Sequence, residues 1–571
     1  MIMIFLLAQL PVGSDTLGVA KTNPDSLAVD SLAEDTIPKY KIPEVVSFAD
    51  GGAAPPGALS AFPINDYDLF LSDAFAVTPS LNRDGLIYRR GNDPYRFSAT
   101  LNGRPLNHRW SGYFDVDEIA IQFLDRVAET GRGIDFQTKI NHYARPYSYL
   151  RFTALGSTTL YDLNFTRPIT NEMGFYWAGL YCRTWIPRDT LAVLSRTNAY
   201  YADFYWNNFF KSRLDLIYDG RSTGDGRKNE TYDAALTLGR GSVKTQFYCD
   251  AYGFSDRDSL SGFYAANNDL TYGLLSRGNH RAAMIDIAWE LGGTGDNSSS
   301  ETPWSGRQSF GFYYIGHGWA EVVKKIARAR FALSGAFDYI DGNMSVFMPG
   351  ARVEYTLADS QYLFATVQRD YRAPSLNEIY GGNLVYDPQF PFHGNPDLRY
   401  EYRWREEAGF SGRNLTLSLY KNDYHDYIYA VSEYADTFYQ YDNRVSARAL
   451  GVEDFLEFPV RWGFSFGLCG DYLIQADSLP SYPKYNAEFS LAWQAEKGRA
   501  RYRIIGWGRY LGPRFPGGQA DLRPVFSAAA QVKFITLLAA LKFDNVLDEQ
   551  VRDFPLSARN VSLSVKWEFW D

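Results

Sequence analysis

Apolar and polar residues alternate one by one along the last residues of the chain, which predicts an extended strand with two different faces. The apolar face carries Val561, Leu563, Val565, Trp567 and Phe569, and the polar face carries Ser562, Ser564, Lys566 and Glu568. Such a strand suits a soluble sandwich, where the apolar face looks into a core. It equally suits a membrane barrel, where that face looks out at lipid and the polar face lines a lumen.

The same alternation recurs from about residue 141 to the end of the chain. The clearest hairpin spans 486–507, with a turn predicted at Glu496-Lys497-Gly498. Further strands are expected within 330–340, 351–370 and 413–424, and long polar loops at 292–308 and 381–398. With about ten residues per spanning strand, this part of the chain supports roughly 18 to 22 strands, and 22 is the favoured number.

Composition favours the membrane reading of the pattern. Aromatic residues make up 16% of the 571 residues, which fits strands with aromatic girdles, while the chain shows no evident linkers between separate soluble domains. Beyond the first residues we find no apolar run long enough for a membrane-spanning helix. The sequence therefore predicts an all-β membrane protein, a large antiparallel transmembrane barrel formed by residues 141–571.

Charge and reactive residues exclude several other functions. The formal net charge of −9 provides no basic field that would recruit nucleic acid. The three cysteines and six histidines are scattered without metal-ligand spacing, so no metal site is predicted, and one disulfide remains possible. No nucleophile, base and orienting group stand together, so we expect no catalytic residues, no enzyme activity and no cofactor.

The N-terminal residues divide into two segments. Residues 1–13 have the apolar core of a secretory signal, although the usual basic leader is missing. Residues 14–61 are rich in Asp, Ser, Thr and Pro and are expected to form a disordered tether. Within the tether, the β-prone segment Ile42-Pro43-Glu44-Val45-Val46-Ser47-Phe48 could be captured by a partner that adds it to a sheet edge, or could pack locally as a first strand.

Residues 62–140 predict a small mixed α+β region. A helix is expected at 67–75, followed by strands within 86–89, 97–101 and 123–128 and a tight turn at Asn102-Gly103. The region has only a small hydrophobic core and is rich in arginine, so we expect it to lie in polar surroundings. Its arginines could pair with lumen-facing carboxylates such as Glu488 and Glu568, or could be ordinary solvated charges.

These segments together resemble the TonB-dependent receptors of bacterial outer membranes, large β-barrels plugged by their own N-terminal domain. Residues 42–48 resemble the family's TonB box, and RAPSLNEIY at 372–380 with GNPDLRYE at 394–401 resembles a barrel motif. The motif residues in the plug-like region are Arg89, Arg90, Gly91, Asn102, Gly103, Arg126 and Gly131.

The resemblance implies an outer-membrane receptor that takes up a scarce small-molecule ligand such as a siderophore, another metal chelate or cobalamin. Its expected partners are outer-membrane lipid and a periplasmic TonB-type energy-coupling protein. The sequence departs from the family where IDFQTK follows Gly133 at once, which shortens the plug inside the lumen. A passive porin-like or structural barrel with a vestigial plug is therefore an alternative, and a barrel lipase or protease is a more distant one.

Overall fold

The alternating residues form β-strands through almost all of the chain that the structure describes. The structure is a computed structural model, and it describes residues 76–79, 85–88, 94–114, 118–129, 133–138 and 146–570. Gaps in the last range lie at 156–157, 171, 189–190, 208–209, 225, 259–262, 283–284, 303–305, 341–343, 359, 381–391, 434–437, 478–483, 512–524 and 548–558. The expected signal segment, tether and helix 67–75 lie outside the described residues.

Twenty-two antiparallel strands in the described part of the chain form a closed barrel, as the sequence predicts. The first thirteen are β7 (Tyr147–Ala154), β8 (Thr158–Pro168), β9 (Met173–Arg188), β10 (Leu191–Asn207), β11 (Lys211–Thr223), β12 (Lys228–Arg240), β13 (Val243–Asp258), β14 (Phe263–Ala282), β15 (Ile285–Thr302), β16 (Gly306–Ile326), β17 (Ala329–Ile340), β18 (Met344–Ala358) and β19 (Gln361–Arg372). The remaining nine are β21 (Glu401–Ser411), β22 (Leu415–Glu433), β23 (Phe438–Pro459), β24 (Phe464–Asp477), β25 (Tyr485–Lys497), β26 (Ala500–Leu511), β27 (Val525–Phe534), β28 (Leu537–Asp544) and β29 (Asn560–Trp570).

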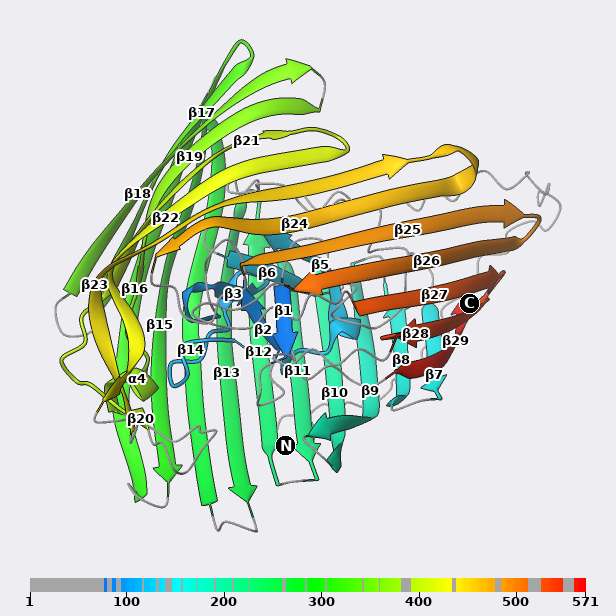
Figure 1. The fold of residues 1–571 in the computed structure, drawn as a ribbon, viewed down its shortest axis with the longest axis horizontal. Helices are drawn as coiled ribbons and strands as arrows, with labels where there is room; N and C mark the ends of the chain where they lie inside the picture. The colour runs from blue at the N-terminus through cyan, green and yellow to red at the C-terminus, as the bar shows by residue number, and fades with distance from the viewer. Residues whose placement is uncertain are drawn as a thin grey trace. The chain divides into compact units, whose positions relative to one another are not determined.

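The barrel closes by pairing its last strand with its first. Strands β29 and β7 pair antiparallel, with Trp570 opposite Tyr147, and each other strand pairs with its neighbours in the ring (Figure 1). A closed ring leaves no unpaired sheet edge, which is a requirement for strands that cross lipid.

Short connections gather at one end of the barrel. Two-residue turns at 241–242, 327–328, 498–499 and 535–536 join strands there, and we call this the short-turn end. The longest connections, 373–400, 512–524 and 545–559, all join strands at the opposite end. Short turns at one end and long loops at the other are typical of outer-membrane barrels.

The barrel strands sort their residues between two faces. On β29, Leu563, Trp567 and Phe569 have 39%, 53% and 40% of their surface exposed on the outside, whereas Glu568 on the other face is buried. The apolar face therefore points outward, as it must if lipid surrounds the barrel. No helix in the described part of the chain has the length and hydropathy needed to cross a bilayer.

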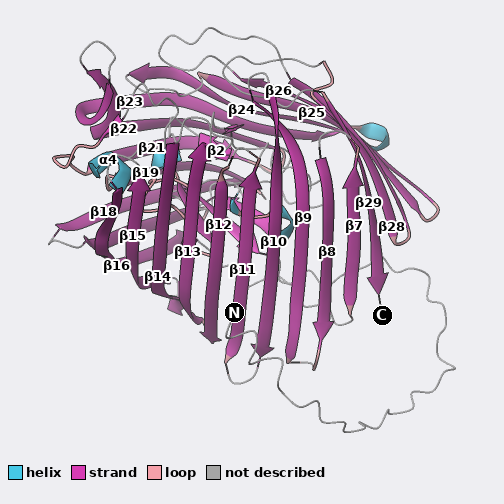
Figure 2. Cartoon of the chain, turned by 90° about the horizontal axis from the view of Figure 1, so that it is seen from below, coloured by secondary structure: helices cyan, strands magenta, loops and turns pink. Residues whose placement is uncertain are grey.

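Residues 94–138 form a small sheet, which we call the N-terminal sheet. Its strands are β3 (Ser98–Leu101), β4 (Arg104–Pro105), β5 (Leu124–Glu129) and β6 (Gly133–Thr138), in the order β4-β3-β6-β5. The 3-10 helices η2 (Pro94–Arg96) and η4 (Ile121–Phe123) precede β3 and β5, and a separate pair, β1 (Ala76–Pro79) and β2 (Gly85–Tyr88), comes before them. Strands β3, β5 and β6 lie within the ring of barrel strands (Figure 1), where residues of this sheet form one core with residues of β8 to β11. Figure 2 shows the ring from below.

The predicted turn at Asn102-Gly103 is confirmed. Leu101 pairs with Arg104, and both intervening residues have positive φ, 51° for Asn102 and 86° for Gly103. Two consecutive positive φ values define the tight hairpin turn for which Asn-Gly is the preferred sequence.

A short helix, α4 (Leu376–Tyr380), lies in the long connection between β19 and β21. Ser375 caps it, because its Oγ accepts a hydrogen bond from the Glu378 amide at 3.3 Å while the Glu378 carboxylate accepts one from the Ser375 amide at 2.8 Å. This reciprocal pair is a capping box, and it explains why such a short helix forms here. One further 3-10 helix, η5 (Arg461–Gly463), forms the turn before β24.

One predicted loop is wrong. Most of the stretch 292–308 belongs to β15 and β16, which continue as a paired hairpin up to Thr302 and from Gly306. The Gly, Ser and Asn residues that suggested a loop pair with β16, with a register shift between Asn297 and Ser299, and the inward-facing Asp296, Ser298 and Ser300 are buried. The other predicted loop, 381–398, is described from residue 392, where the two-residue strand β20 (Phe392–His393) pairs with β23.

Candidate functional site at the inner surface of the barrel

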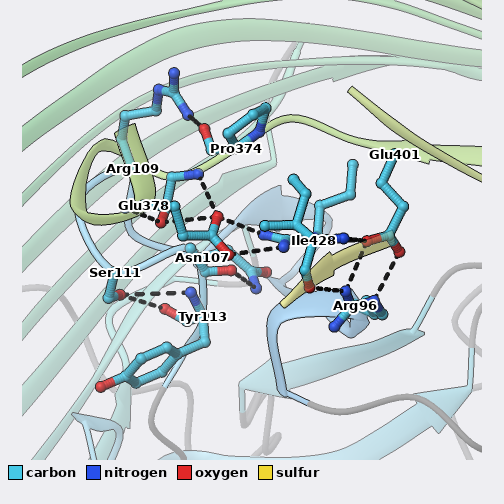
Figure 3. Close-up of polar contacts among 12 residues, drawn as sticks. Arg96, Asn107, Arg109, Ser111, Tyr113, Pro374, Glu378, Glu401 and Ile428 are labelled. Carbon is cyan, nitrogen blue, oxygen red and sulfur yellow. Dashed lines mark hydrogen bonds and ion pairs between the residues drawn. The ribbon is translucent and has the colours of Figure 1, made fainter. Parts of the chain in front are cut away.

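Arg96, at the end of η2, makes several polar contacts between the N-terminal sheet and the barrel. Its Nε and Nη2 donate to the two carboxylate oxygens of Glu401, each at 2.6 Å, and Nη2 also donates to the carbonyl of Ile428 at 2.7 Å (Figure 3). The guanidinium carbon lies 3.7 Å from the ring centre of Tyr427. Both charged side chains are almost fully buried, so the ion pair is a strong positional constraint.

The long connection between β19 and β21 is fastened to the same region. The amides of Leu376 and Asn377 donate to the carbonyls of Arg109 and Trp110 at 3.1 and 3.0 Å, and the Arg109 guanidinium donates to the Pro374 carbonyl (Figure 3). The start of α4 therefore lies directly on the N-terminal sheet's loop.

Arg372 holds α4 in place from the barrel side. It forms two hydrogen bonds of 2.7 Å with the carboxylate of Glu378. Burial would raise the pKa of Glu378, but the charge and hydrogen bonds of Arg372 lower it below its usual range. The RAPSLNEIY motif at 372–380 thus links the barrel to the N-terminal sheet.

A second ion pair joins the N-terminal sheet to the opposite wall. Arg104 on β4 is completely buried and contacts both carboxylate oxygens of Asp233 on β12. Burial opposes the charge of Arg104, yet the neighbouring carboxylates, Asp233 first, raise its pKa. Asp233 is itself directly opposite Asp250 on β13.

This wall is lined with inward-facing aspartates. Asp203 on β10 lies opposite Asp215 on β11, with Arg213 contacting both carboxylates. Both aspartates are buried, as are the further members of the set, Asp233, Asp250, Asp269 and Asp296. Since these residues occupy inward positions on β10 to β15, this wall presents a row of carboxyl groups to the N-terminal sheet, among which lie Arg213 and Arg277 of the same wall.

Among the described cationic side chains of the N-terminal sheet, His108 is the one that can lose its proton. Its Nε2 contacts the Glu118 carboxylate at 2.5 Å, and its ring stacks on Tyr252 of β13 with ring centres 3.7 Å apart. Burial alone would lower the pKa of His108, but the charge of Glu118, supported by Asp269 and Asp250, raises it to about 9. The loop after β4 is therefore held by a buried charged histidine near neutral pH.

The Asn102-Gly103 turn contacts the barrel through its backbone. Arg277 on β14 donates to the Gly103 carbonyl at 2.8 Å, and the Gly103 amide donates to Asp135 at 2.7 Å. Asn102 bonds the side chain and amide of Thr138, which in turn accepts a hydrogen bond from Arg213 at 2.8 Å. The Asn102-Gly103 turn is therefore linked to two arginines of the barrel wall, to Arg277 directly and to Arg213 through Thr138.

The remaining contact is apolar. Phe123, Leu101, Ile134 and Phe136 of the N-terminal sheet belong to one core that also contains inward-facing residues of β8 to β11, among them Leu160, Tyr176, Tyr201 and Ile217. Phe123 and Tyr201 are both fully buried, with ring centres 5.6 Å apart. The interface is thus ionic on two sides and apolar on a third, and complete removal of the sheet would expose apolar surface.

The structure describes only part of the predicted motif set. Asn102 and Gly103 lie in the contacts above, and Arg126 lies on β5 without a described side chain. Arg89, Arg90, Gly91, Gly131 and the TonB-box-like residues 42–48 lie outside the described residues.

The carboxylates predicted to receive arginines are different from the observed ones. Glu568 binds Lys533 and Lys566 of the barrel wall at 2.8 and 2.9 Å, and the side chain of Glu488 is not described. The observed partners are Glu401 and Asp233. A search for acidic residues at inward strand positions would have found Asp233, whereas Glu401 begins its strand and carries no such signal. Within the described ranges, no three His, Cys, Asp or Glu side chains could hold a metal ion together.

Comparisons with known proteins agree with this architecture. Similar solved structures include a mutant of the ferric enterobactin receptor PfeA of Pseudomonas aeruginosa in complex with enterobactin, which is 16% identical with a TM-score of 0.71, covering 89% of this chain and 98% of that chain. The siderophore receptor PirA of Acinetobacter baumannii is 13% identical with a TM-score of 0.71, covering 91% of this chain and 98% of that one. The copper transporter OprC is 13% identical with a TM-score of 0.73, covering 89% and 96%. At these identities the likeness shows the fold alone.

A search of curated proteins finds no match. The family model "TonB dependent receptor-like, beta-barrel" matches residues 65–534, which is most of the chain. The chain therefore belongs to the TonB-dependent receptor β-barrel family of the bacterial outer membrane.

Proposed function

We propose that this protein is an energised outer-membrane receptor that takes up a scarce small molecule, a metal chelate such as a siderophore or a cobalamin. Residues 62–140 act as the plug and residues 141–571 as the barrel. Residues 14–61 are the periplasmic tether, in which residues 42–48 bind a TonB-type energy-coupling protein. The family membership and the siderophore and copper proteins among the similar structures support this class of ligand.

The observation that carries the proposal is the buried ionic attachment of the N-terminal sheet to two walls of the barrel. Arg96 binds Glu401 on β21, and Arg104 binds Asp233 on β12, across the space inside the ring. Buried ion pairs fix geometry while contributing little net stability, because desolvation offsets most of their attraction. A sheet held in this way occupies the lumen at rest and can be rearranged when the chain before it is pulled.

The apolar core that the N-terminal sheet shares with β8 to β11, which we call the seam, determines how that rearrangement proceeds. Pulling the whole sheet out would expose Phe123, Phe136 and Tyr201, which is costly. Separation along the ionic walls exposes charged groups, which water solvates well. The geometry therefore favours partial remodelling, with the seam acting as the fixed side.

A passive barrel with a vestigial plug remains the second candidate, because the described N-terminal sheet has only four strands. The two functions differ in their need for residues 42–48. Capture by sheet addition requires backbone N–H groups, so the substitution Val46→Pro removes one donor and blocks pairing, whereas Ala53→Pro in the neighbouring spacer leaves the segment intact.

The test measures binding of a purified periplasmic TonB domain to the full-length chain and to both variants. An energised receptor binds the domain, loses binding with Val46→Pro and keeps it with Ala53→Pro, and its gene supports growth under iron or cobalt starvation. A chain that binds no TonB domain and conducts ions in planar bilayers is the passive barrel instead.

A further inference from the structure

Three neighbouring strands carry charged residues on their outward face at a level where the rest of the barrel is uncharged. Glu406 on β21 pairs across strands with Lys421 on β22, and Asp454 follows on β23. On the other described barrel strands, outward positions four to seven residues from the short-turn end carry apolar, small or neutral side chains. We call Glu406, Lys421 and Asp454 the charged notch.

Register shows that Asp454 faces outward. It lies directly opposite Leu417 on β22 and Gly470 on β24, and Leu417 has 45% of its surface exposed on the outside. The next outward row contains Leu419 and Tyr472, each 48% exposed. Among the described residues, the Asp454 carboxylate makes no hydrogen bond or ion pair.

The charged notch lies at a height where the barrel crosses the membrane. Asp454 is five residues from Pro459 at the end of β23, Glu406 is five from Ser411 at the end of β21, and Lys421 is six from Leu415 at the start of β22. At about 3.3 Å per residue and a tilt of about 40°, this places the three roughly 13 to 15 Å from the short-turn ends of their own strands. The apolar band of such barrels is about 25 Å tall, so the three charges meet hydrocarbon unless protein covers them.

We propose that the charged notch is the contact surface between two copies of this chain in the outer membrane. Across β21, β22 and β23 the outward charges run negative, positive, negative, with Glu406 directly opposite Lys421 and Asp454 four residues nearer to the short-turn end. A two-fold axis along the membrane normal, passing between β22 and β23, places β22 of each copy against β23 of the partner, so that Lys421 faces the strand that carries the partner's Asp454. A two-fold contact is self-complementary in this way, because each residue pair occurs twice.

The surroundings of the notch suit a second copy better than lipid. Leu415, Leu417, Leu419 and Tyr472 flank the charges with exposed apolar surface, which can pack against the same residues of the partner. Lys421 contacts Asp423, which Arg448 also binds at 2.7 Å, and it lies 3.8 Å from Glu406, so Glu406 and Asp423 both have cations within a single copy. The third carboxylate, Asp454, gains a cation only from outside.

The test is a charge exchange in the purified full-length chain, with mass measured by native mass spectrometry and light scattering in detergent. We expect the wild type to be a dimer and Asp454→Lys and Lys421→Asp to weaken it at least tenfold. The double exchange Asp454→Lys with Lys421→Asp restores the dimer. Leu491→Asp, which places a carboxylate at the same level on β25, leaves it unchanged, and heat-modifiable gel migration verifies folding of each variant.

Two results overturn the proposal: a monomeric wild type, or a folded double exchange that stays monomeric. If the charge variants do not fold, Val452→Cys, in a background without native cysteines, replaces them. This position on β23 lies beside the expected axis, so it forms a disulfide dimer in outer membranes, while Phe347→Cys on β18 does not. Absence of the Val452→Cys dimer, or an adduct with a different chain, also overturns the proposal. None of these results depends on ligand uptake or TonB binding.

Discussion

Arg96 and Glu401 lie 305 residues apart in the chain and form two parallel hydrogen bonds of 2.6 Å inside the barrel. Glu401 is the first residue of β21, and its Oε2 also accepts a hydrogen bond from the Ile428 amide at 3.0 Å. One carboxylate therefore joins the N-terminal sheet, the end of the long connection and β22. Loss of this group affects all three at once.

Glu401→Ala should loosen the N-terminal sheet while the barrel stays folded. Removing one partner of a buried pair leaves an uncompensated guanidinium, which typically costs about 3–5 kcal/mol. We expect faster proteolysis of residues 94–138 and increased ion conductance in planar bilayers, with unchanged heat-modifiable migration of the barrel.

A double substitution separates the pair's positional role from its net stability. Arg96→Met with Glu401→Leu should be less damaging than Glu401→Ala, because no charge is left buried. The partly exposed pair Lys228 and Glu230 supplies the control, since Glu230→Gln should change stability by no more than about 1 kcal/mol. Equal proteolysis of Glu401→Ala and Glu230→Gln would contradict a central role for Glu401.

Gly103→Ala should destabilise the N-terminal sheet by more than the strain of a positive φ alone would cost. The residue has a φ of 86°, and a Cβ atom there would overlap the guanidinium of Arg277, which donates to the Gly103 carbonyl. Gly241→Ala is the matched control, since it has a φ of 60° in another two-residue turn and nothing within 4 Å of the new atom. The control should cost about 1 kcal/mol from strain.

The comparison uses chemical denaturation monitored by proteolysis of the N-terminal sheet. The excess effect of Gly103→Ala over Gly241→Ala measures the loss of the Arg277 contact. Comparable effects for both variants would show that Arg277 moves aside freely.

The outward face of β29 predicts how the barrel responds to charge. Leu563→Arg places a cation against hydrocarbon, which costs about 2–4 kcal/mol near the middle of a bilayer. Ser564→Arg, one residue along the same strand, points into the lumen, where Ser564 bonds Thr153 at 3.0 Å. Folding into lipid vesicles should therefore fail or slow for Leu563→Arg and proceed for Ser564→Arg; the reverse order would mean that the faces of β29 are inverted.

The sequence predicted best those strands in which alternating apolar and polar residues decide which side of the strand faces outward. The hairpin at 486–507 is confirmed, with Trp493 opposite Ile504, although its turn falls at 498–499 instead of 496–498. A period of two fixes which residues share a face, but it leaves the turn position, and with it the pairing, open by a residue or two. The Asn102-Gly103 turn was predictable because few other dipeptides adopt two positive φ values.

The failures have two causes. Where β15 and β16 run past the band of apolar outward residues, both faces become polar and the alternation disappears, so 292–302 resembled a loop. The pairings of Arg96 with Glu401 and of Arg104 with Asp233 could not be predicted, although Asp233 was recognisable as an inward acidic residue, because each arginine meets its partner only when the barrel closes around the N-terminal sheet. Contacts of that kind depend on topology and stagger, which a single strand's sequence does not contain.

His108 predicts that the N-terminal sheet becomes less firmly held as the pH rises. Its folded-state pKa of about 9 is above the ordinary value of 6.5, so its stabilising charge is complete below about pH 6.5 and is lost as the pH rises through about 9. A shift of this size corresponds to roughly 3 kcal/mol.

The measurement is the rate of cleavage of residues 94–138 by proteinase K between pH 6 and pH 10. The rate should increase toward the upper end in the wild type. His108→Gln should be cleaved faster at pH 6 and show a flatter profile, because the neutral amide cannot pair with Glu118 as a cation. An unchanged pH profile in His108→Gln would assign the effect to another group. Since Glu118 and the stacked Tyr252 surround the ring, Glu118→Gln should move the wild-type transition to lower pH, which no purely steric role of His108 would produce.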